Sequence, residues 1–164
     1  MKKPFVVAVS GRKNSGKTTC IERLLPLLAE AGVQTAVIKH HGHDLDPDVP
    51  GTDTYRFFHV GAVGAVITDD SNFMLVKRSK ADERALMAYF PEADLILLEG
   101  YKRSAWPKIE MLRHIKEPDS DPSTLIAVVS DDPACRVPAG TPIFRFGDCE
   151  GIAALLLRLL RSVV

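Results

Sequence analysis

The sequence has no excess of charge of either sign. Lysine and arginine together number 21, aspartate and glutamate also number 21, and the formal net charge at pH 7 is zero. Proteins that bind nucleic acid or anionic membranes through their overall charge carry a surplus of basic residues. We therefore expect no general affinity for nucleic acid or membranes, and any anion must be bound by a local group of residues.

Cysteine is scarce, and no two cysteines have the C-x-x-C spacing. Cys20, Cys135 and Cys149 are odd in number and far apart in the chain. This pattern argues against a disulfide framework and against a cysteine zinc site. We expect reduced, packed thiols in a cytoplasmic protein.

Long apolar runs are also missing. The run that follows MKKP is too short for a signal peptide. The C-terminal stretch GIAALLLRLLRSVV contains Arg158 and Arg161 and is shorter than the ~20 residues that span a bilayer. Its apolar residues recur at i, i+3 and i+4 spacing, which predicts an amphipathic helix capped by Asp148.

Short apolar runs recur along the chain, and most lack polar alternation. This pattern predicts strands covered on both faces, as in a parallel sheet. Helical spacing follows Gly16, with Gly32 as the stop, and also marks residues 53–60 and 81–90. The predicted strands are Phe5–Val9, Val33–Ile38, Val63–Ile67, Leu95–Leu98, Leu125–Val129 and Ile143–Phe146, with two more in NFMLVKRS and in the half-buried PKIEMLRH.

These elements predict an α/β fold with a mostly parallel sheet and helices on both faces. The chain contains 46% apolar and 26% charged residues and no internal repeat, which suits a single globular domain over residues 1–164. The segments HHGHDLDPDVPG and KEPDSDPS are expected to be loops, the second a solvated connection.

A glycine-rich motif follows the first predicted strand. Gly11–Thr18 reads G-R-K-N-S-G-K-T and matches the pattern G-x-x-x-x-G-K-[ST], between a buried strand and an amphipathic helix. Glycines let several backbone N–H groups approach one phosphate chain, and the helix adds free N–H groups and the positive end of its dipole. The motif predicts a P-loop that binds a nucleotide.

The side chains of this motif have separate expected roles. Lys17 is expected to reach the β- and γ-phosphates, and the hydroxyl of Thr18 to coordinate Mg²⁺. The candidate nucleotide-binding residues in this segment are Gly11, Lys13, Asn14, Ser15, Gly16, Lys17, Thr18 and Thr19.

Such a site also needs a carboxylate near the metal. Glu99 follows the apolar run LILL, and the carboxyl ends of parallel strands form the ligand-binding edge of a sheet. We expect Glu99 to bind the metal and, with Lys17, to be a catalytic residue. Asp53, in GTDTYRF, is a further candidate metal ligand, although helix-end charge explains it equally well.

Three histidines follow the second predicted strand. Lys39, His40, His41 and His43 lie in VIKHHGHD and should reach the same sheet edge. The spacing does not match a structural zinc site, and no cysteine pair accompanies it. We therefore favour a polar loop near phosphates or a second ligand, with Lys39 and His40 as nucleotide-binding candidates, over zinc binding.

The strand LIAVV ends in Ser130, Asp131 and Asp132, which we expect at the same edge as the glycine-rich motif. A carboxylate can accept both the N1–H and the 2-amino group of guanine, whereas adenine offers an acceptor at N1. We expect one of the two aspartates to read guanine. A polar turn after a strand is the alternative.

Taken together, the motifs resemble the molybdopterin-guanine dinucleotide biosynthesis adapter family, protein B of that pathway. The segments GRKNSGKTT, VIKHHGH, PGTDTYRFFHVGA, LILLEGYK and PKIEMLR occur in the family's order and span most of Val6–Arg113. The family pattern usually has a histidine where Phe57 stands in this chain.

The resemblance implies a three-layer α/β P-loop NTPase fold, a homodimer, and binding of GTP and Mg²⁺ with weak hydrolysis. It also implies an adapter that assists the nucleotidyltransferase, protein A of the pathway, in joining GMP to molybdopterin. Two other functions remain open on the residues alone. They are an ATP-dependent small-molecule kinase or ligase of the dethiobiotin synthetase type, and a metal-delivery GTPase that uses the histidine loop.

Overall fold

The structure is a computed structural model that describes residues 3–42 and 48–163. Contacts within the chain divide it into two compact units. The first consists of Met1–His40 with Ala85–Val164, and the second of His41–Arg84. The single nucleotide-binding domain expected over residues 1–164 stays a prediction.

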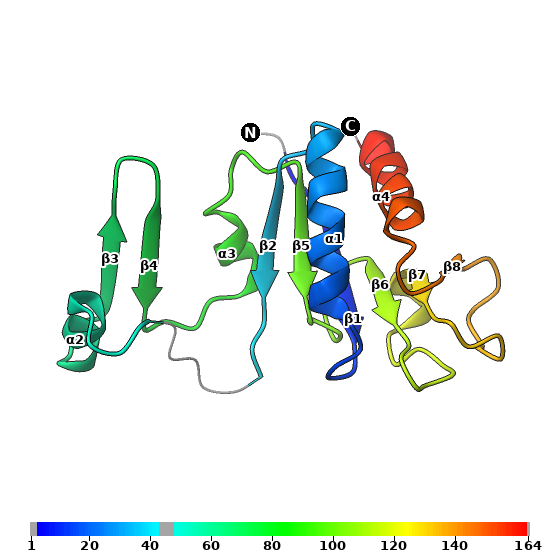
Figure 1. The fold of residues 1–164 in the computed structure, drawn as a ribbon, viewed down its shortest axis with the longest axis horizontal. Coiled ribbons are helices and arrows are strands. Elements are labelled where there is room, and N and C mark those ends of the chain that lie inside the picture. The colour runs from blue at the N-terminus through cyan, green and yellow to red at the C-terminus, as the bar shows by residue number, and fades with distance from the viewer. Residues whose placement is uncertain (1–2, 43–47, 164) are drawn as a thin grey trace. The chain divides into compact units, whose positions relative to one another are not determined.

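The first unit is built on a six-stranded sheet with the strand order β2-β5-β1-β6-β7-β8 (Figure 1). Every neighbouring pair in this sheet is parallel, so all six strands end at one edge. The predicted mostly parallel α/β sheet is therefore confirmed. The strands are β1 (Phe5–Gly11), β2 (Thr35–Lys39), β5 (Leu95–Glu99), β6 (Lys108–Met111), β7 (Leu125–Val129) and β8 (Ile143–Phe144).

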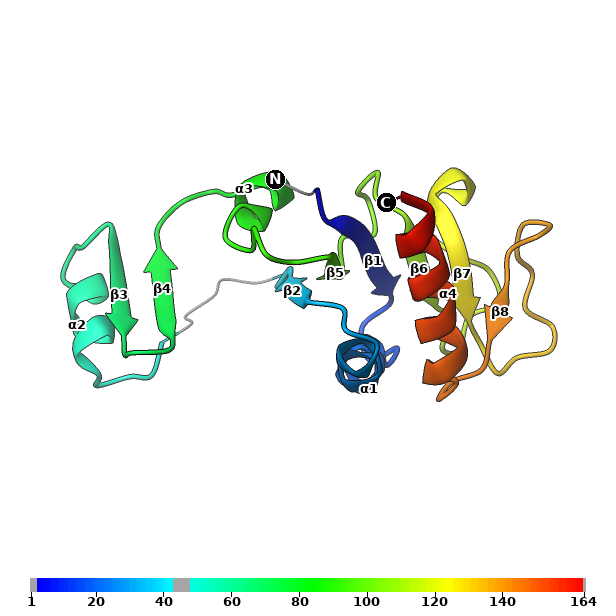
Figure 2. The same cartoon turned by 90° about the horizontal axis from the view of Figure 1, so that it is seen from above.

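Helices cover both faces of this sheet, as predicted (Figure 2). On one face, α1 (Lys17–Glu30) and α4 (Cys149–Val163) pack against β1, β5, β6 and β7. On the other face, apolar residues of α3 (Glu83–Met87) and of the following turn pack against β1 and β5. One short 3₁₀ helix, Pro122–Thr124, precedes β7.

The first helix is amphipathic and has a glycine at each end. Cys20, Ile21, Leu24 and Leu28 form its buried stripe. Gly32 has a φ of +77°, and its N–H donates to the carbonyl of Ala29 at 2.9 Å. A left-handed residue after the last turn is a common helix end, and it was expected at Gly32.

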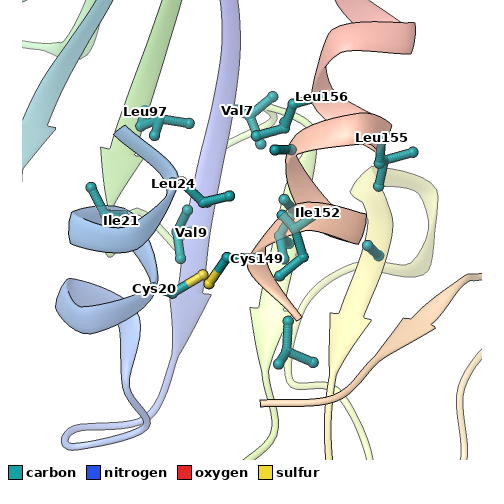
Figure 3. Packing of buried hydrophobic residues seen from close by; sticks show 14 of the residues in the cluster. Val7, Val9, Cys20, Ile21, Leu24, Leu97, Cys149, Ile152, Leu155 and Leu156 are labelled. Carbon is teal, nitrogen blue, oxygen red and sulfur yellow. The ribbon is translucent and has the colours of Figure 1, made fainter. Parts of the chain in front are cut away.

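The core between the two long helices contains two thiols. Figure 3 shows Cys20 of α1 and Cys149 of α4 with their sulfur atoms directed toward each other. All three cysteines are free, and the predicted packing is confirmed for Cys20 and Cys149, whereas Cys135 is only partly buried. Burial, with a contribution from Cys149, raises the pKa of Cys20 to about 12, so its thiol stays protonated at neutral pH.

Strand β6 differs from its prediction. The alternation in PKIEMLRH predicted half burial, but Lys108–Met111 is buried throughout because β6 lies between β1 and β7. The two polar residues find partners inside the protein. Lys108 Nζ donates to the carbonyls of Ser104 and Trp106, and Glu110 accepts two backbone N–H groups. Burial lowers the pKa of Lys108, and the negative charges of Asp121 and Glu110 partly oppose this shift.

The second unit contains α2 (Asp53–His59) and an antiparallel hairpin of β3 (Gly64–Thr68) and β4 (Phe73–Lys77). Thr52 caps α2 by accepting the N–H of Tyr55. The strand predicted at Val63–Ile67 is confirmed in position, but its burial on both faces is wrong, because Val66 and Ile67 are exposed. Within the described ranges, no helix combines the length and apolar character needed to cross a bilayer.

Candidate functional site

The glycine-rich loop, residues Gly11–Thr18, joins the end of β1 to the start of α1 in the first unit. Gly11 has a φ of +133°, and a Cβ at this position would lie 2.6 Å from the carbonyl oxygen of Met111. Asn14 and Gly16 also adopt positive φ values, of 62° and 95°. The left-handed backbone and the close approach to β6 explain why glycine is needed at Gly11 and Gly16.

The first turn of α1 has no side-chain cap. Its N-cap residue is Gly16, which has no side-chain oxygen to accept the free N–H groups of the turn. No acidic residue lies in this first turn. The helix start therefore presents N–H donors and a positive dipole end to an anion, as the motif predicted.

Lys17 lies over the backbone of the loop. Its Nζ donates to the carbonyl of Arg12 at 2.7 Å and to that of Gly11 at 3.1 Å. Burial lowers the pKa of Lys17, Glu99 opposes the shift, and Lys39 adds to it. A cationic side chain held this way is positioned to meet an anion bound in the loop.

Thr18, Lys39 and Glu99 form a polar cluster beside the loop. Lys39 and Glu99 are paired in register at the ends of β2 and β5. The Thr18 hydroxyl donates to Glu99 Oε1 at 2.8 Å, and Lys39 Nζ lies 3.1 Å from the same oxygen. Lys39 Nζ also donates to Thr18 Oγ1 at 3.4 Å. The side chain of Glu99 is only 9% exposed, and the ammonium group of Lys39 balances its negative charge.

This cluster fits the ligand chemistry of Mg²⁺. The Thr18 hydroxyl and the Glu99 carboxylate are hard oxygen donors. Two oxygens at adjacent positions of one Mg²⁺ octahedron lie about 2.9 Å apart when each is about 2.0–2.1 Å from the metal. The separation of 2.8 Å between Thr18 Oγ1 and Glu99 Oε1 is that of their hydrogen bond, and it would also allow both oxygens to bind one cation. Lys39 shares Glu99 Oε1 and would compete with a cation for it.

The histidine loop lies only partly within the described residues. The backbone N–H of His40 donates to the carbonyl of Glu99 at 3.0 Å, and the His40 ring meets Tyr101 edge-on at 5.5 Å. His43 lies outside the described residues. Over residues 3–42 and 48–163, no three His, Cys, Asp or Glu side chains gather as a metal-binding group.

Asp53 is in the second unit, at the first position of α2. Its side chain is 80% exposed and forms an ion pair with Arg56 one turn later, at 3.5 Å. An acidic residue in the first helical turn is favourable for the helix dipole, which matches the alternative expected from the sequence. A role of Asp53 in metal binding stays a prediction.

The residues expected to read the base follow β7. Asp131 Oδ1 accepts the backbone N–H of Phe146 at 3.1 Å, and Asp132 Oδ1 accepts that of Ala134 at 2.8 Å. Ser130 Oγ accepts the N–H of Asp132 at 3.2 Å. Each aspartate thus orders a loop with one oxygen, and its other oxygen can accept further bonds.

A pocket of about 210 Å³ opens beside the loop and involves residues that the sequence analysis missed. It is lined by Gly16 and Thr19 of the α1 end, by Arg23 and Arg113, and by Phe146 and Gly147 before α4. The lining contains two arginines and no carboxylate. Arg113 and Phe146 follow strands that end at the loop edge, and this position is the only signal that points to them in the sequence.

The segment KEPDSDPS is more than a solvated connection. The buried Glu110 accepts the backbone N–H groups of Asp119 and Ser120, each at 2.9 Å. The Asp119 carboxylate then lies 3.3 Å from Arg12 Nε and 3.8 Å from Lys102 Nζ. A buried carboxylate thus fixes a loop that contacts the glycine-rich loop, and the solvated-connection prediction is wrong for Ser120, which is buried.

Comparison with known proteins gives one consistent family. The family model for molybdopterin guanine dinucleotide synthesis protein B matches residues 6–131. A probable molybdopterin-guanine dinucleotide biosynthesis adapter protein of Bacillus subtilis is 39% identical to this chain. The matched segment covers 67% of this chain and 66% of that protein. The adapter protein of Escherichia coli is 28% identical over 96% of this chain and 94% of its own length.

The fold agrees with solved structures of the same family. The crystal structure of Bacillus subtilis MobB is 30% identical, has a TM-score of 0.75, and covers 93% of this chain and 96% of its own. A crystal structure of molybdopterin-guanine biosynthesis protein B is 26% identical, has a TM-score of 0.72, and covers 96% of this chain and 99% of its own. On its sequence and its fold, the chain belongs to the molybdopterin guanine dinucleotide synthesis protein B family.

Proposed function

We propose that this protein is a GTP-binding adapter with weak GTPase activity in molybdenum cofactor biosynthesis. It assists the nucleotidyltransferase that attaches GMP to molybdopterin. The observation that carries the nucleotide part is the convergence of Lys17, Thr18 and Glu99 at a helix start with free N–H groups. Family membership supports the adapter part.

The cluster has the parts that triphosphate binding requires. The backbone of the loop and Lys17 neutralise phosphate charge, and Thr18 and Glu99 would hold Mg²⁺. Mg²⁺ would supply charge neutralisation of the β- and γ-phosphates.

Guanine preference is expected to come from Asp131 or Asp132. A carboxylate that accepts from N1–H and the 2-amino group loses both partners with adenine, and an unsatisfied buried group costs about 1–3 kcal/mol. We expect GTP to bind at least about tenfold more tightly than ATP.

The aspartate that reads the base can be found with asparagine variants. Xanthine has a carbonyl where guanine has its amine, so Asp→Asn at the reading position should shift preference from GTP to XTP. Asp131→Asn and Asp132→Asn are made separately, and the affinities of GTP, ATP and XTP are measured. Each retains a side-chain oxygen that can accept the backbone N–H bonded in the wild type. An unchanged GTP-to-XTP ratio in both variants would exclude this strand end from base reading.

The adapter role is tested by reconstitution. The partner nucleotidyltransferase should be retained by the immobilised protein, and its formation of the dinucleotide should rise when the protein and GTP are both added. A protein that binds GTP but neither retains the transferase nor changes its rate would contradict the adapter role and leave nucleotide binding intact.

A homodimer is expected to form through the β3–β4 hairpin. Val66 lies opposite Leu75, and Ile67 lies opposite Met74, so both faces of the hairpin are apolar. These four side chains and Phe73, which is 64% exposed, face solvent in the single chain. An isolated two-stranded hairpin is marginally stable in water, and a second copy would cover these faces.

Sedimentation equilibrium tests this interface. The wild type should be dimeric, and Phe73→Glu and Val66→Glu should each weaken the dimer by at least about tenfold, because each buries a charge in an apolar contact. Tyr89→Glu changes an exposed aromatic residue of the other compact unit and should leave association unchanged. A monomeric wild type would contradict the dimer, and unchanged association in both hairpin variants would contradict this interface.

A further inference from the structure

Arg113 lies directly beside the start of α1. A Cβ placed on Gly16 would be 3.6 Å from Arg113 Nη2 and 3.8 Å from Cε1 of Phe146. The guanidinium carbon of Arg113 stacks over the Phe146 ring at 4.3 Å from its centre. Arg113 is an exposed residue, and its stacking on Phe146 places the guanidinium at the end of the glycine-rich loop that is adjacent to the pocket.

Within residues 3–42 and 48–163, the charge of Arg113 is not neutralised by a carboxylate. No carboxylate among the described residues forms an ion pair with Arg113, and none lines the pocket. An aromatic face positions a guanidinium without using its N–H groups, which stay able to bind an anion. Arg12, by contrast, is paired with Asp119.

A chain of contacts fixes this position. Asp131 Oδ1 accepts the backbone N–H of Phe146, and Phe146 in turn supports Arg113. Arg113 comes directly after Leu112, and both Leu112 and the preceding strand β6 are buried. A guanidinium that is held in advance loses less entropy on binding an anion than a free surface arginine does.

Lys17 and Arg113 lie at two different places along the glycine-rich loop. Lys17 Nζ lies at the carbonyls of Gly11 and Arg12, whereas Arg113 lies at Gly16, where the pocket begins. The lining of the pocket also includes Thr19, Arg23 and Gly147. Its volume of about 210 Å³ is below the roughly 300–1,000 Å³ of sites that enclose a whole ligand, so it suits only part of a nucleotide.

We infer that Arg113 binds the nucleotide phosphate that is attached to the ribose, and that the pocket beside it takes part of the nucleoside. This inference rests on the proposed nucleotide-binding function. Arg113 supplies a planar pair of N–H donors to the phosphate, Phe146 positions it, and Lys17 serves the phosphates further along the chain.

The experiment compares GTP, GMP and guanosine as competitors of a fluorescent GDP analogue. Arg113→Ala should weaken GTP and GMP by at least about tenfold and leave guanosine unchanged, because only the phosphate contact is lost. Lys17→Ala should weaken GTP and leave GMP within about twofold, because GMP lacks the phosphates that Lys17 reaches. Arg113→Lys keeps the charge but loses the fork and the stacking, and should fall between wild type and Arg113→Ala.

Arg158→Ala is the matched control, because it removes an arginine from the exposed side of α4 outside the pocket. It should bind all three ligands like the wild type. If the wild type binds GTP and Arg113→Ala binds GMP within about twofold of it, the inference is overturned while the proposed function stands. An equal loss for guanosine would also overturn it, since Arg113 would then serve the nucleoside. A wild type that does not bind GTP would overturn the proposed function itself.

The positioning role of Phe146 has a separate readout. Phe146→Leu keeps an apolar side chain but removes the aromatic face, and should weaken GMP by about two- to fivefold. In the Arg113→Ala background the same change should weaken GMP binding less than it does in the wild type, because only the contribution of Phe146 to the pocket lining remains. Losses that add up in the double variant would show that Phe146 does not act through Arg113.

Discussion

Lys17→Ala is expected to lower the affinity for GTP by at least about tenfold and to leave the fold intact. A charge-assisted contact to phosphate contributes about 1.5–3 kcal/mol, and 1.4 kcal/mol corresponds to tenfold in affinity. Among the described residues, Lys17 Nζ donates its hydrogen bonds to oxygens of the glycine-rich loop, so its removal should leave no cavity in the core. Titration calorimetry with GTP and Mg²⁺ measures the effect.

Lys116→Ala is the control for this variant, because Lys116 is an exposed lysine that follows β6 in the same unit. It removes the same charge and should change GTP affinity by less than about twofold, since exposed charges interact weakly. The thermal midpoints of both variants should stay near that of the wild type. Unchanged GTP affinity in Lys17→Ala would refute the assignment of this loop to phosphate binding.

Glu99→Gln is expected to keep GTP affinity within about tenfold and to raise the Mg²⁺ concentration needed for hydrolysis by about tenfold. Gln keeps the shape of the side chain and an oxygen that can accept from Thr18, but it loses the charge that a hard cation prefers. The loss of one charge-assisted contact gives this order of magnitude. GTP hydrolysis measured over a Mg²⁺ series tests the expectation.

Glu22→Gln makes the same chemical change on the exposed side of α1 and should hydrolyse GTP like the wild type. Thr18→Ala provides a second variant of the metal site. It should weaken GTP binding more in the presence of Mg²⁺ than in its absence, because the hydroxyl serves the metal. Normal hydrolysis by Glu99→Gln at limiting Mg²⁺ would leave Glu99 as an acid that merely ends a strand.

The framework of the first unit could be predicted from short-range patterns. The apolar run Leu125–Val129 coincides with β7, and the stripe after Gly16 coincides with α1. These elements are read correctly because each buries one continuous apolar surface in a single core. The loop between β1 and α1 could also be predicted, because its glycines are needed for positive φ values at Gly11 and Gly16.

Burial that depends on contacts between residues far apart in the sequence could not be predicted. Lys108 and Glu110 look like the polar side of a half-buried strand, yet both are buried by β1 and β7. Their hydrogen-bond partners are backbone groups of residues before and after the strand. The periodicity of apolar residues does not predict these bonds. The exposed strand at Val66 and Ile67 is the opposite case, an apolar run that the single chain does not cover.

The candidate site shows the same division. Lys17 and Thr18 follow from one contiguous motif, and Glu99 follows from the rule that strand ends share an edge. Arg113 and Phe146 come together with Gly16 only because β6 and β8 bring their following residues to that edge. A pairing between three separate segments of the chain requires the fold before it can be seen.

The most direct test of Mg²⁺-dependent GTP binding is a calorimetric titration of the wild type with GTP and with ATP, each with and without Mg²⁺. We predict that GTP binds to one site per chain, that Mg²⁺ strengthens this binding, and that ATP binds at least about tenfold more weakly. Absence of GTP binding would contradict the nucleotide site built on Lys17, Thr18 and Glu99. Equal binding of ATP would contradict guanine recognition and favour the kinase or ligase alternative.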